Sequence, residues 1–247
     1  TEFGKQSWCQ QFATKSTRCF CANCRNIFVK IRIPQEWFAR RRIWRKIRVC
    51  SVEKIMQSNI VDIDVSVEPN RLNFAPQFNV AVAFIDRHLA EGRGDKVAIR
   101  TIDEEWSYKA LGESLNQYGN YLLSTGIKPG ERLMMVVRDC PDFIAMFFGA
   151  IKAGIIPAPV NTLLRSEDYG YLITDSECAC FVYSAQFAET LALALAGADH
   201  KPANVLVAED LVGQVKTASN VLEAAPTTHM DDCFWLYSSG STGNPKG

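Results

Sequence analysis

The end of the chain, where an apolar run meets a loop of hydroxyls and glycines, constrains the fold more than any other stretch. Residues 234–237 are Phe-Trp-Leu-Tyr, which predicts a buried strand. Residues 238–247 follow as Ser-Ser-Gly-Ser-Thr-Gly-Asn-Pro-Lys-Gly, and their glycines let the backbone turn tightly and approach an anion. The hydroxyls, the backbone N–H groups and the Lys246 ammonium are donors for phosphate oxygens. The junction predicts a strand that leads into a phosphate loop, and therefore a nucleotide ligand.

Two other kinds of phosphate loop are excluded by the spacing of these residues. A Walker loop needs Gly-Lys-Ser/Thr at its end, but here Pro245 precedes Lys246 and Gly247 follows it. The dinucleotide fingerprint Gly-x-Gly-x-x-Gly is absent from the sequence. A flexible Gly/Ser linker is a further alternative, but a linker has no need of the Pro-Lys-Gly ending or of the preceding apolar run.

The distribution of charge divides the chain into two unlike segments. The 247 residues have a net charge of zero, with 47% hydrophobic and 22% charged residues, as in an ordinary globular protein. Residues 1–55 hold 13 Lys and Arg against 3 Asp and Glu, a net charge of +10, whereas residues 56–247 hold 14 against 24, a net charge of −10. We therefore expect residues 1–55 to be a non-native or disordered upstream segment and residues 56–247 to carry the fold.

Three interpretations compete for residues 1–55. Cys19, Cys21 and Cys24 provide half of a metal site, but a second Cys pair at zinc-finger spacing does not follow. The basic stretch 40–48 is typical of an arm that binds nucleic acid or a membrane surface. The third interpretation is translated upstream sequence, because Glu-Phe at positions 2–3 matches a cloning site and the codons for Val-Glu at 52–53 can form a ribosome-binding sequence. On this interpretation the native start is Met56.

From residue 72 onward, apolar residues recur with the periods of strands and helices, separated by Gly and Pro turns. Strands or extended segments are predicted at 97–102, 133–137, 155–160, 179–183, 205–207 and 234–237. Helices are predicted within 74–89, from the cap Ser107 to Gly126, from Pro141 to Gly154, from Ser166 onward, and at 187–195 and 212–224. The apolar face of the helix that begins after Ser107 consists of Leu111, Leu115, Tyr118 and Leu122. The alternation predicts an α/β fold with a mostly parallel sheet layered with helices. Ligands bind such sheets at the carboxyl ends of the strands, where we expect the loop at 238–247.

Few other side chains are candidates for chemistry. Cys140, Cys178, Cys180 and Cys233 lie in apolar surroundings and are interpreted as reduced core thiols of a cytosolic protein. The histidines lack the spacing of metal ligands and are interpreted as surface or capping residues; they are His88, His200 and His229. Lys152 is expected to extend from the end of its helix to solvent. The apolar stretch 143–160 contains this lysine and two prolines, so it is interpreted as core and not as a membrane span.

Three blocks of sequence within residues 72–247 together carry a resemblance to a known family. Residues 106–111 are Trp-Ser-Tyr-Lys-Ala-Leu, residues 149–161 begin Gly-Ala-Ile-Lys-Ala-Gly and end Pro-Val-Asn, and residues 238–247 are the phosphate loop. In this order they resemble the signatures of the adenylate-forming superfamily of acyl- and aryl-CoA ligases, luciferases and peptide-synthetase adenylation domains, although Ala110 replaces the usual Glu of the first block. The sequences at 160–171 and 234–243 resemble those of benzoate-CoA and hydroxybenzoate-CoA ligases.

The resemblance implies an acid–thiol ligase that uses ATP, Mg²⁺ and coenzyme A. Such enzymes join a carboxylate, here benzoate or a hydroxybenzoate, to ATP, release pyrophosphate, and pass the acyl group from acyl-AMP to coenzyme A. Because negative charge grows on the departing phosphates, the loop must surround them with donors. The resemblance assigns this role to Ser238, Ser239, Gly240, Ser241, Thr242, Gly243 and Lys246. It places neither a catalytic residue nor a metal ligand in this chain.

The resemblance ends inside the phosphate loop, where a family member is less than half complete. The ribose-binding aspartate, the acyl pocket and the catalytic lysine have no counterpart here, so we expect an inactive N-terminal portion of an AMP-binding domain. We expect a cytoplasmic enzyme with a small aromatic carboxylate as substrate and with neither nucleic acid nor membrane as partner. For the full-length enzyme, the resemblance allows a homodimer. The alternatives are another acyl-CoA synthetase of the superfamily, or a basic, cysteine-containing nucleic-acid-binding arm fused to a nucleotide-binding module.

Overall fold

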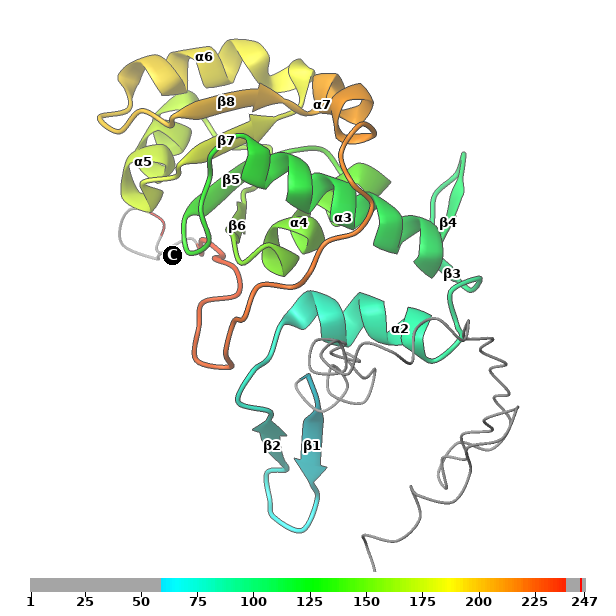
Figure 1. Ribbon diagram of the computed structural model, residues 1–247. Coiled ribbons are helices and arrows are strands. Elements are labelled where there is room, and N and C mark those ends of the chain that lie inside the picture. The colour runs from blue at the N-terminus through cyan, green and yellow to red at the C-terminus, as the bar shows by residue number, and fades with distance from the viewer. Residues whose placement is uncertain (1–58, 239–244, 246–247) are drawn as a thin grey trace, which may run out of the picture. The chain divides into compact units, whose positions relative to one another are not determined.

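The computed structural model describes residues 59–238 and Pro245 (Figure 1). The predictions made for residues 1–55, for the start at Met56, for residues 239–243 and for Lys246 lie outside the described residues.

A four-stranded parallel sheet organises the described region (Figure 1). Its strands follow the order β6-β5-β7-β8 and are β5 (Arg132–Val136), β6 (Ile156–Pro159), β7 (Cys180–Tyr183) and β8 (Asn204–Val207). Met134 of β5 pairs with Ala158 of β6 on one side and with Phe181 of β7 on the other. Residues 133–136 of β5 are fully buried, as expected for the central strand of a parallel sheet covered on both faces.

Helices cover both faces of this sheet. The face with Leu133, Met135 and Val182 packs against α3 (Tyr108–Ser124), α4 (Pro141–Lys152) and α7 (Ala208–Val215). The opposite face, with Met134 and Phe181, packs against α5 (Ser166–Ser176) and α6 (Ala188–Gly197), and the short turn η3 (Ala185–Phe187) leads into α6. The predicted α/β fold, a mostly parallel sheet layered with helices, is confirmed.

Two antiparallel strand pairs and a helix precede the sheet along the chain. β1 (Val61–Asp64) pairs with β2 (Arg71–Phe74), and β3 (Val97–Arg100) pairs with β4 (Glu105–Ser107). Between the pairs, the π-helical turn η2 (Val82–Asp86) continues into α2 (Arg87–Ala90). The sequence does not predict the β1–β2 hairpin, because every residue of β2 is exposed and neither strand has a buried apolar face.

The predicted ends of α3 and α4 are confirmed by their backbone geometry. The Ser107 hydroxyl accepts the backbone N–H of Ala110 at 3.2 Å and so caps α3. Gly126 has a φ of +93° just beyond α3, a conformation that favours glycine. Pro141 occupies the first turn of α4, where an N–H would have no helical partner. The predicted apolar face of α3 is buried, and it consists of Leu111, Leu115, Tyr118 and Leu122.

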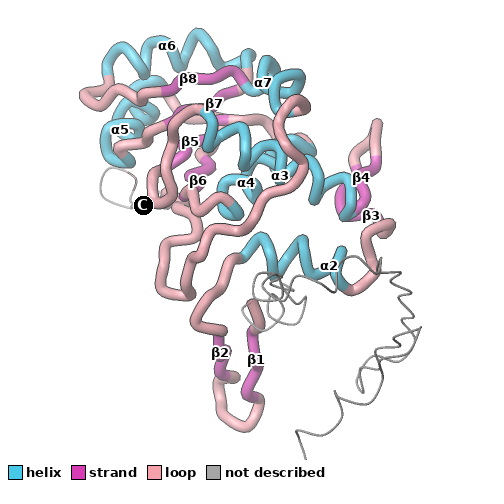
Figure 2. Tube along the Cα trace, viewed as in Figure 1, coloured by secondary structure: helices cyan, strands magenta, loops and turns pink. Residues whose placement is uncertain are grey.

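The predicted helix at 212–224 is wrong over most of its length. α7 begins at Ala208 and ends at Val215. The chain that follows it, from residue 216 to residue 238, is drawn as loop (Figure 2). Side chains of α3 engage backbone oxygens in this stretch: Asn116 Nδ2 donates to the oxygen of Asn220 at 2.9 Å, and Asn120 Nδ2 donates to that of Ser219 at 2.8 Å. The loop is therefore held along α3 by residues distant in sequence, which local periodicity cannot reveal.

Candidate functional site

The structure describes one of the seven residues expected to hold phosphates, Ser238, and the other six lie outside the described residues. The site is therefore built from residues 225–238, the stretch that carries the loop, which we call the stem. The predicted buried strand at 234–237 is wrong, because these residues lie outside the strands of the described region, and Phe234 is 42% and Leu236 61% exposed. The residues between them, Trp235 and Tyr237, are half-buried, so one side of the stem faces the protein and the other faces away.

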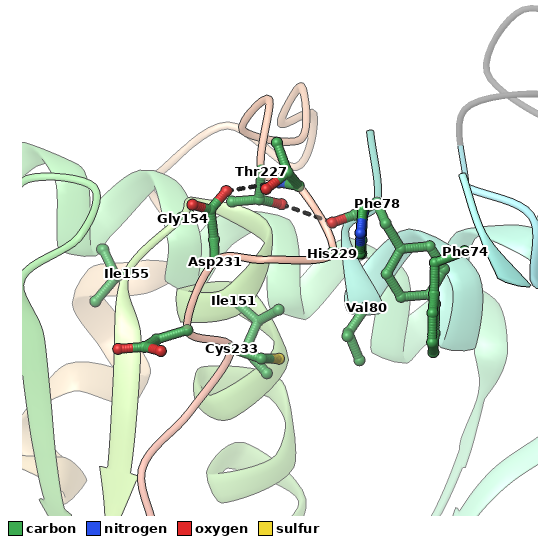
Figure 3. Close-up of a pocket in the computed structure, with 12 residues that line it drawn as sticks. Phe74, Phe78, Val80, Ile151, Gly154, Ile155, Thr227, His229, Asp231 and Cys233 are labelled. Atoms are coloured by element: carbon green, nitrogen blue, oxygen red, sulfur yellow. Dashed lines mark hydrogen bonds between the residues drawn. The ribbon is translucent and has the colours of Figure 1, made fainter. Parts of the chain in front are cut away.

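The base of the stem is clasped by Asn79, which is only 3% exposed. Its amide nitrogen donates to the backbone oxygen of Ile151 at 3.0 Å and to the Thr227 hydroxyl at 3.2 Å, while its amide oxygen accepts the N–H of Ala81 at 3.1 Å. The Thr227 hydroxyl in turn donates to the backbone oxygen of Phe78 at 3.0 Å (Figure 3). One buried, fully engaged amide thus joins the stem to α4 and to the chain that leads into η2.

The middle of the stem lies beside the edge strand β6. The backbone N–H of Trp235 donates to the oxygen of Pro157 at 3.0 Å. Because Pro157 and Pro159 have no N–H, β6 offers acceptors here but few donors, and the stem contacts this edge without adding a strand to the sheet. The Trp235 indole N–H donates to Asp232 at 3.3 Å, and the guanidinium carbon of Arg132 lies 5.4 Å from the centre of the Trp235 ring.

The end of the stem is held by Tyr237, directly before Ser238. The Tyr237 hydroxyl donates to Asp175 Oδ2 at 2.8 Å, and the Tyr171 hydroxyl donates to Asp175 Oδ1 at 3.3 Å. The Tyr237 ring packs against the apolar cluster on the α5–α6 side of the sheet. Burial, followed by the neighbouring Asp175 carboxylate, raises the pKa of the Tyr237 hydroxyl above its usual value, which strengthens the preference of this group for its protonated, donating form.

These contacts place the end of the stem at the amino ends of β5 and β7; the loop itself, which was predicted at the carboxyl ends of the strands, lies almost wholly outside the described residues. Asp175 belongs to the last turn of α5, shortly before β7 begins, and Arg132 is the first residue of β5. The prediction assumed that a strand of the parallel sheet leads into the loop. The stem instead passes the edge of the sheet from outside it, so the rule for loops that follow parallel strands does not apply.

The glycines of the Gly-Ala-Ile-Lys-Ala-Gly block mark close backbone approaches. A Cβ at Gly149 would lie 2.5 Å from the backbone oxygen of Leu115, where α4 meets α3. Gly154 has a φ of +78°, and a Cβ there would lie 2.8 Å from the Cβ of Ala225 at the start of the stem. The block therefore fixes the packing of two helices and the path of the stem.

Lys152 of the same block is buried, which corrects the prediction that it extends to solvent. The residue is 4% exposed, and its ammonium lies 2.8 Å from Asp86 Oδ2 and 3.0 Å from Oδ1. Its backbone oxygen accepts the N–H of Ala225 at 2.8 Å. A buried ammonium needs an acidic partner, and Asp86 of η2 supplies it. Lys152 thus ties the end of α4 to a neighbouring helix and to the stem.

A pocket of about 170 Å³ opens beside the base of the stem (Figure 3). Phe74, Ile151 and the stem residues His229, Asp231 and Cys233 contribute to its lining. The Asp231 carboxylate accepts the backbone N–H of Thr228 at 2.6 Å. The His229 ring stacks on Phe74 with ring centroids 6.4 Å apart. Burial raises the pKa of the Cys233 thiol. The Asp231 carboxylate is thus engaged in the turn of the stem, and no hydrogen bond of the described residues joins the side chains of His229, Asp231 and Cys233.

The other histidines lie in separate places. The His88 ring stacks on Tyr108 with centroids 3.9 Å apart, and His200 Nε2 lies 2.9 Å from the backbone oxygen of Cys178. Within residues 59–238, no three His, Cys, Asp or Glu side chains lie close enough together to hold a metal ion. No helix among the same residues is long and apolar enough to cross a membrane.

The sequence did not single out the residues that hold the stem. Asn79 carries a signal that could have been found, because it is the one polar residue in the apolar run 78–85. Thr227 and Asp175 carry no such signal, since their partners lie far away in the sequence.

The profile of the AMP-binding enzyme family matches residues 86–247, well over half of the chain. The chain is 38% identical to benzoate–CoA ligase from Thauera aromatica over 190 residues, which cover 74% of the chain and 36% of the relative. It is 35% identical to 4-hydroxybenzoate–CoA/benzoate–CoA ligase from Rhodopseudomonas palustris over 176 residues, which cover 69% of the chain and 33% of the relative.

A solved structure shares the fold. The crystal structure of the anthranilate CoA ligase AuaEII in complex with anthranoyl-AMP matches with a TM-score of 0.64 and 27% identity, over 70% of this chain and 34% of that one. The chain therefore spans about a third of the length of each of these three proteins.

Proposed function

The chain belongs to the AMP-binding enzyme family, and we propose that it supplies the phosphate-loop region of an ATP-dependent aryl-CoA ligase. The observation that carries this proposal is the 38% identity to a benzoate–CoA ligase, in a family match that runs through residues 238–247. The substrate class is a small aromatic carboxylate, either benzoate or a hydroxybenzoate, and the co-substrates are ATP and coenzyme A.

The proposed reaction has two steps. A carboxylate oxygen attacks the α-phosphorus of ATP, the bond to the β-phosphate breaks, and pyrophosphate leaves with its electron pair. The coenzyme A thiol then loses its proton and attacks the acyl carbonyl, and AMP leaves. In the first step negative charge moves onto the departing phosphates, so hydrogen-bond donors and Mg²⁺ held against those phosphates lower the barrier. Magnesium enters in this proposal as the complex with ATP.

In this proposal the phosphate loop supplies those donors. The groups in direct contact with the phosphates are the Ser239, Ser241 and Thr242 hydroxyls and the Lys246 ammonium, and Ser238, Gly240 and Gly243 complete the loop. Support comes from the family match through these residues and from the stem, whose contacts at Trp235 and Tyr237 hold the residues from which the loop starts.

We also propose that residues 56–247 are the N-terminal portion of an AMP-binding domain and that residues 1–55 do not belong to it. The chain spans about a third of each relative, so we expect it to be inactive without the remaining two thirds. A cytoplasmic location is part of the proposal, and it is supported by the free thiols of the described residues, which are Cys140, Cys178, Cys180 and Cys233.

The test is acid-dependent exchange of labelled pyrophosphate into ATP by the complete enzyme, with benzoate, 4-hydroxybenzoate and a long-chain fatty acid compared at equal concentration. We expect exchange with the two aryl acids and thioester formation once coenzyme A is added. Exchange that is fastest with the fatty acid would favour another acyl-CoA synthetase of the same superfamily, and the absence of exchange with every acid would contradict the proposal.

A further inference from the structure

We propose that Tyr237 and Asp175 form a positioning pair that sets where the phosphate loop leaves the body of the protein. Tyr237 directly precedes Ser238, and its hydroxyl donates to Asp175 Oδ2 at 2.8 Å across 62 positions of sequence. The importance of the pair for catalysis rests on the proposed function, whereas the contact itself does not.

Tyr237 gives the stem a point of attachment two residues beyond Trp235. Trp235 is held by one backbone hydrogen bond to Pro157, and the next residue, Leu236, is 61% exposed. Tyr237 adds a half-buried ring packed against the core and a phenol bonded to a carboxylate, a stronger hydrogen bond than one between neutral groups. Two attachments two residues apart fix the direction as well as the position of the chain at Ser238.

Asp175 is a fixed acceptor because it lies on a well-anchored helix. α5 buries Tyr169, Leu172 and Ile173, and Tyr171 donates to the other oxygen of Asp175, which orients the carboxylate. The end of this helix is fastened to β5, since Arg132 Nε donates to the backbone oxygen of Ser176 at 2.7 Å.

The same Arg132 guanidinium lies over the Trp235 ring. Arg132, the first residue of β5, therefore contacts the Trp235 ring directly and also fastens the end of α5, the helix that carries Asp175. The reaction is faster when the donors that meet the departing phosphates are already held in place before it begins. The pair of Tyr237 and Asp175 would act in this way, by positioning the loop, and it touches no reacting atom.

The experiment compares two single-hydroxyl deletions that affect the same carboxylate. Tyr237→Phe removes the phenol at the loop, and Tyr171→Phe removes the one on α5. Amide hydrogen exchange is measured on the whole 247-residue chain without ligand, in peptides from 238–247 and in peptides from β5 and β7. We expect exchange at 238–247 to become about three- to tenfold faster in Tyr237→Phe and to change much less in Tyr171→Phe, which weakens the orientation of Asp175 but keeps its hydrogen bond with Tyr237.

The acceptor supplies a conservative rescue. Asp175→Asn keeps an oxygen that can accept from Tyr237, so its exchange at 238–247 should lie between that of the wild type and that of Asp175→Ala. Exchange in β5 and β7 should be the same in every variant. Equal exchange at 238–247 in Tyr237→Phe and Tyr171→Phe, or faster exchange throughout the sheet, would overturn the proposal.

Steady-state assays of the complete enzyme separate this proposal from the proposed function. Tyr237→Phe is expected to lower kcat or raise KM for ATP in the pyrophosphate exchange assay while KM for the aryl acid stays constant. An enzyme that activates no aryl acid, but whose exchange at 238–247 still responds to Tyr237→Phe, refutes the function and keeps the pair. An active enzyme that is indifferent to Tyr237→Phe in both measurements refutes the pair and keeps the function.

Discussion

The ammonium of Lys152 lies 2.8 Å from a carboxylate oxygen of Asp86, with the lysine side chain 5% and the aspartate side chain 27% exposed. Removing one partner of such a pair leaves a charge without compensation. We expect Lys152→Met to lower the free energy of unfolding by about 3 kcal/mol, the low end for a buried pair because Asp86 keeps some contact with water. Urea denaturation followed by circular dichroism measures this loss.

Two controls identify the cause of that loss. The double variant Lys152→Met with Asp86→Asn removes both charges and should lose clearly less stability than Lys152→Met alone. The exposed pair of Arg100 and Glu105 is the matched case, and Arg100→Met should change the free energy of unfolding by less than about 1 kcal/mol. Equal losses in Lys152→Met and Arg100→Met would contradict the account of a buried pair.

Two helical glycines differ in the space around them, which predicts opposite effects of alanine. Gly149→Ala places a Cβ 2.5 Å from the backbone oxygen of Leu115 and 3.0 Å from the nitrogen of Gly119, so α3 and α4 must move apart. We expect a loss of about 2 kcal/mol of stability. Gly213→Ala in α7 meets nothing within 4 Å and should leave stability unchanged or raise it by about 0.5–1 kcal/mol. The two melting temperatures, measured side by side, should move apart; if both fall equally, the close approach of α3 and α4 is wrong.

The helices α3 and α4 illustrate what local sequence can predict. The ends of α3 and α4 follow from Ser107, Gly126 and Pro141, and the buried face of α3 follows from residues spaced three or four apart. Each of these signals acts within one element, so local patterns suffice.

The errors arise where distant side chains decide the backbone. Residues 216–224 follow α3 because Asn116 and Asn120 engage their carbonyl oxygens. The apolar run 234–237 stays outside the sheet because the neighbouring edge contains Pro157 and Pro159. The sequence therefore predicts that the apolar run leads into a loop of hydroxyls and glycines, but it predicts neither the path of the stem nor its contacts with Asn79 and Asp175.

The buried cysteines should be unreactive while the protein is folded. Burial raises the pKa of Cys178 to about 11 and that of Cys180 to about 12. Because these folded-state values exceed the ordinary value of about 9, the neutral thiols contribute stability that is complete below about pH 9 and is lost as the pH rises toward 12. In iodoacetamide labelling at pH 8 read by mass spectrometry, we expect Cys140 and Cys233, which are half-buried, to react before Cys178 and Cys180. Labelling of these four cysteines of the described residues at one rate would contradict this.

Deleting residues 1–55 distinguishes an upstream segment from a functional arm. We expect residues 56–247 to unfold with the same denaturation midpoint as the whole chain, and nucleic-acid binding to be absent from both. A cooperative transition that disappears on deletion, or salt-dependent DNA binding that requires residues 1–55, would favour the nucleic-acid-binding arm.

The role of the phosphate loop is tested most directly by assaying the two half-reactions of the complete enzyme separately in Lys246→Ala. Pyrophosphate departs only in the first half, so we predict a loss of roughly ten- to a hundredfold in adenylation, the size of one charge-assisted phosphate contact. Thioester formation from pre-formed acyl-AMP, and the order of preference among aryl acids, should remain nearly unchanged. An equal loss in both halves, or a new order of acid preference, would contradict the assignment of residues 238–247 to the phosphates of ATP.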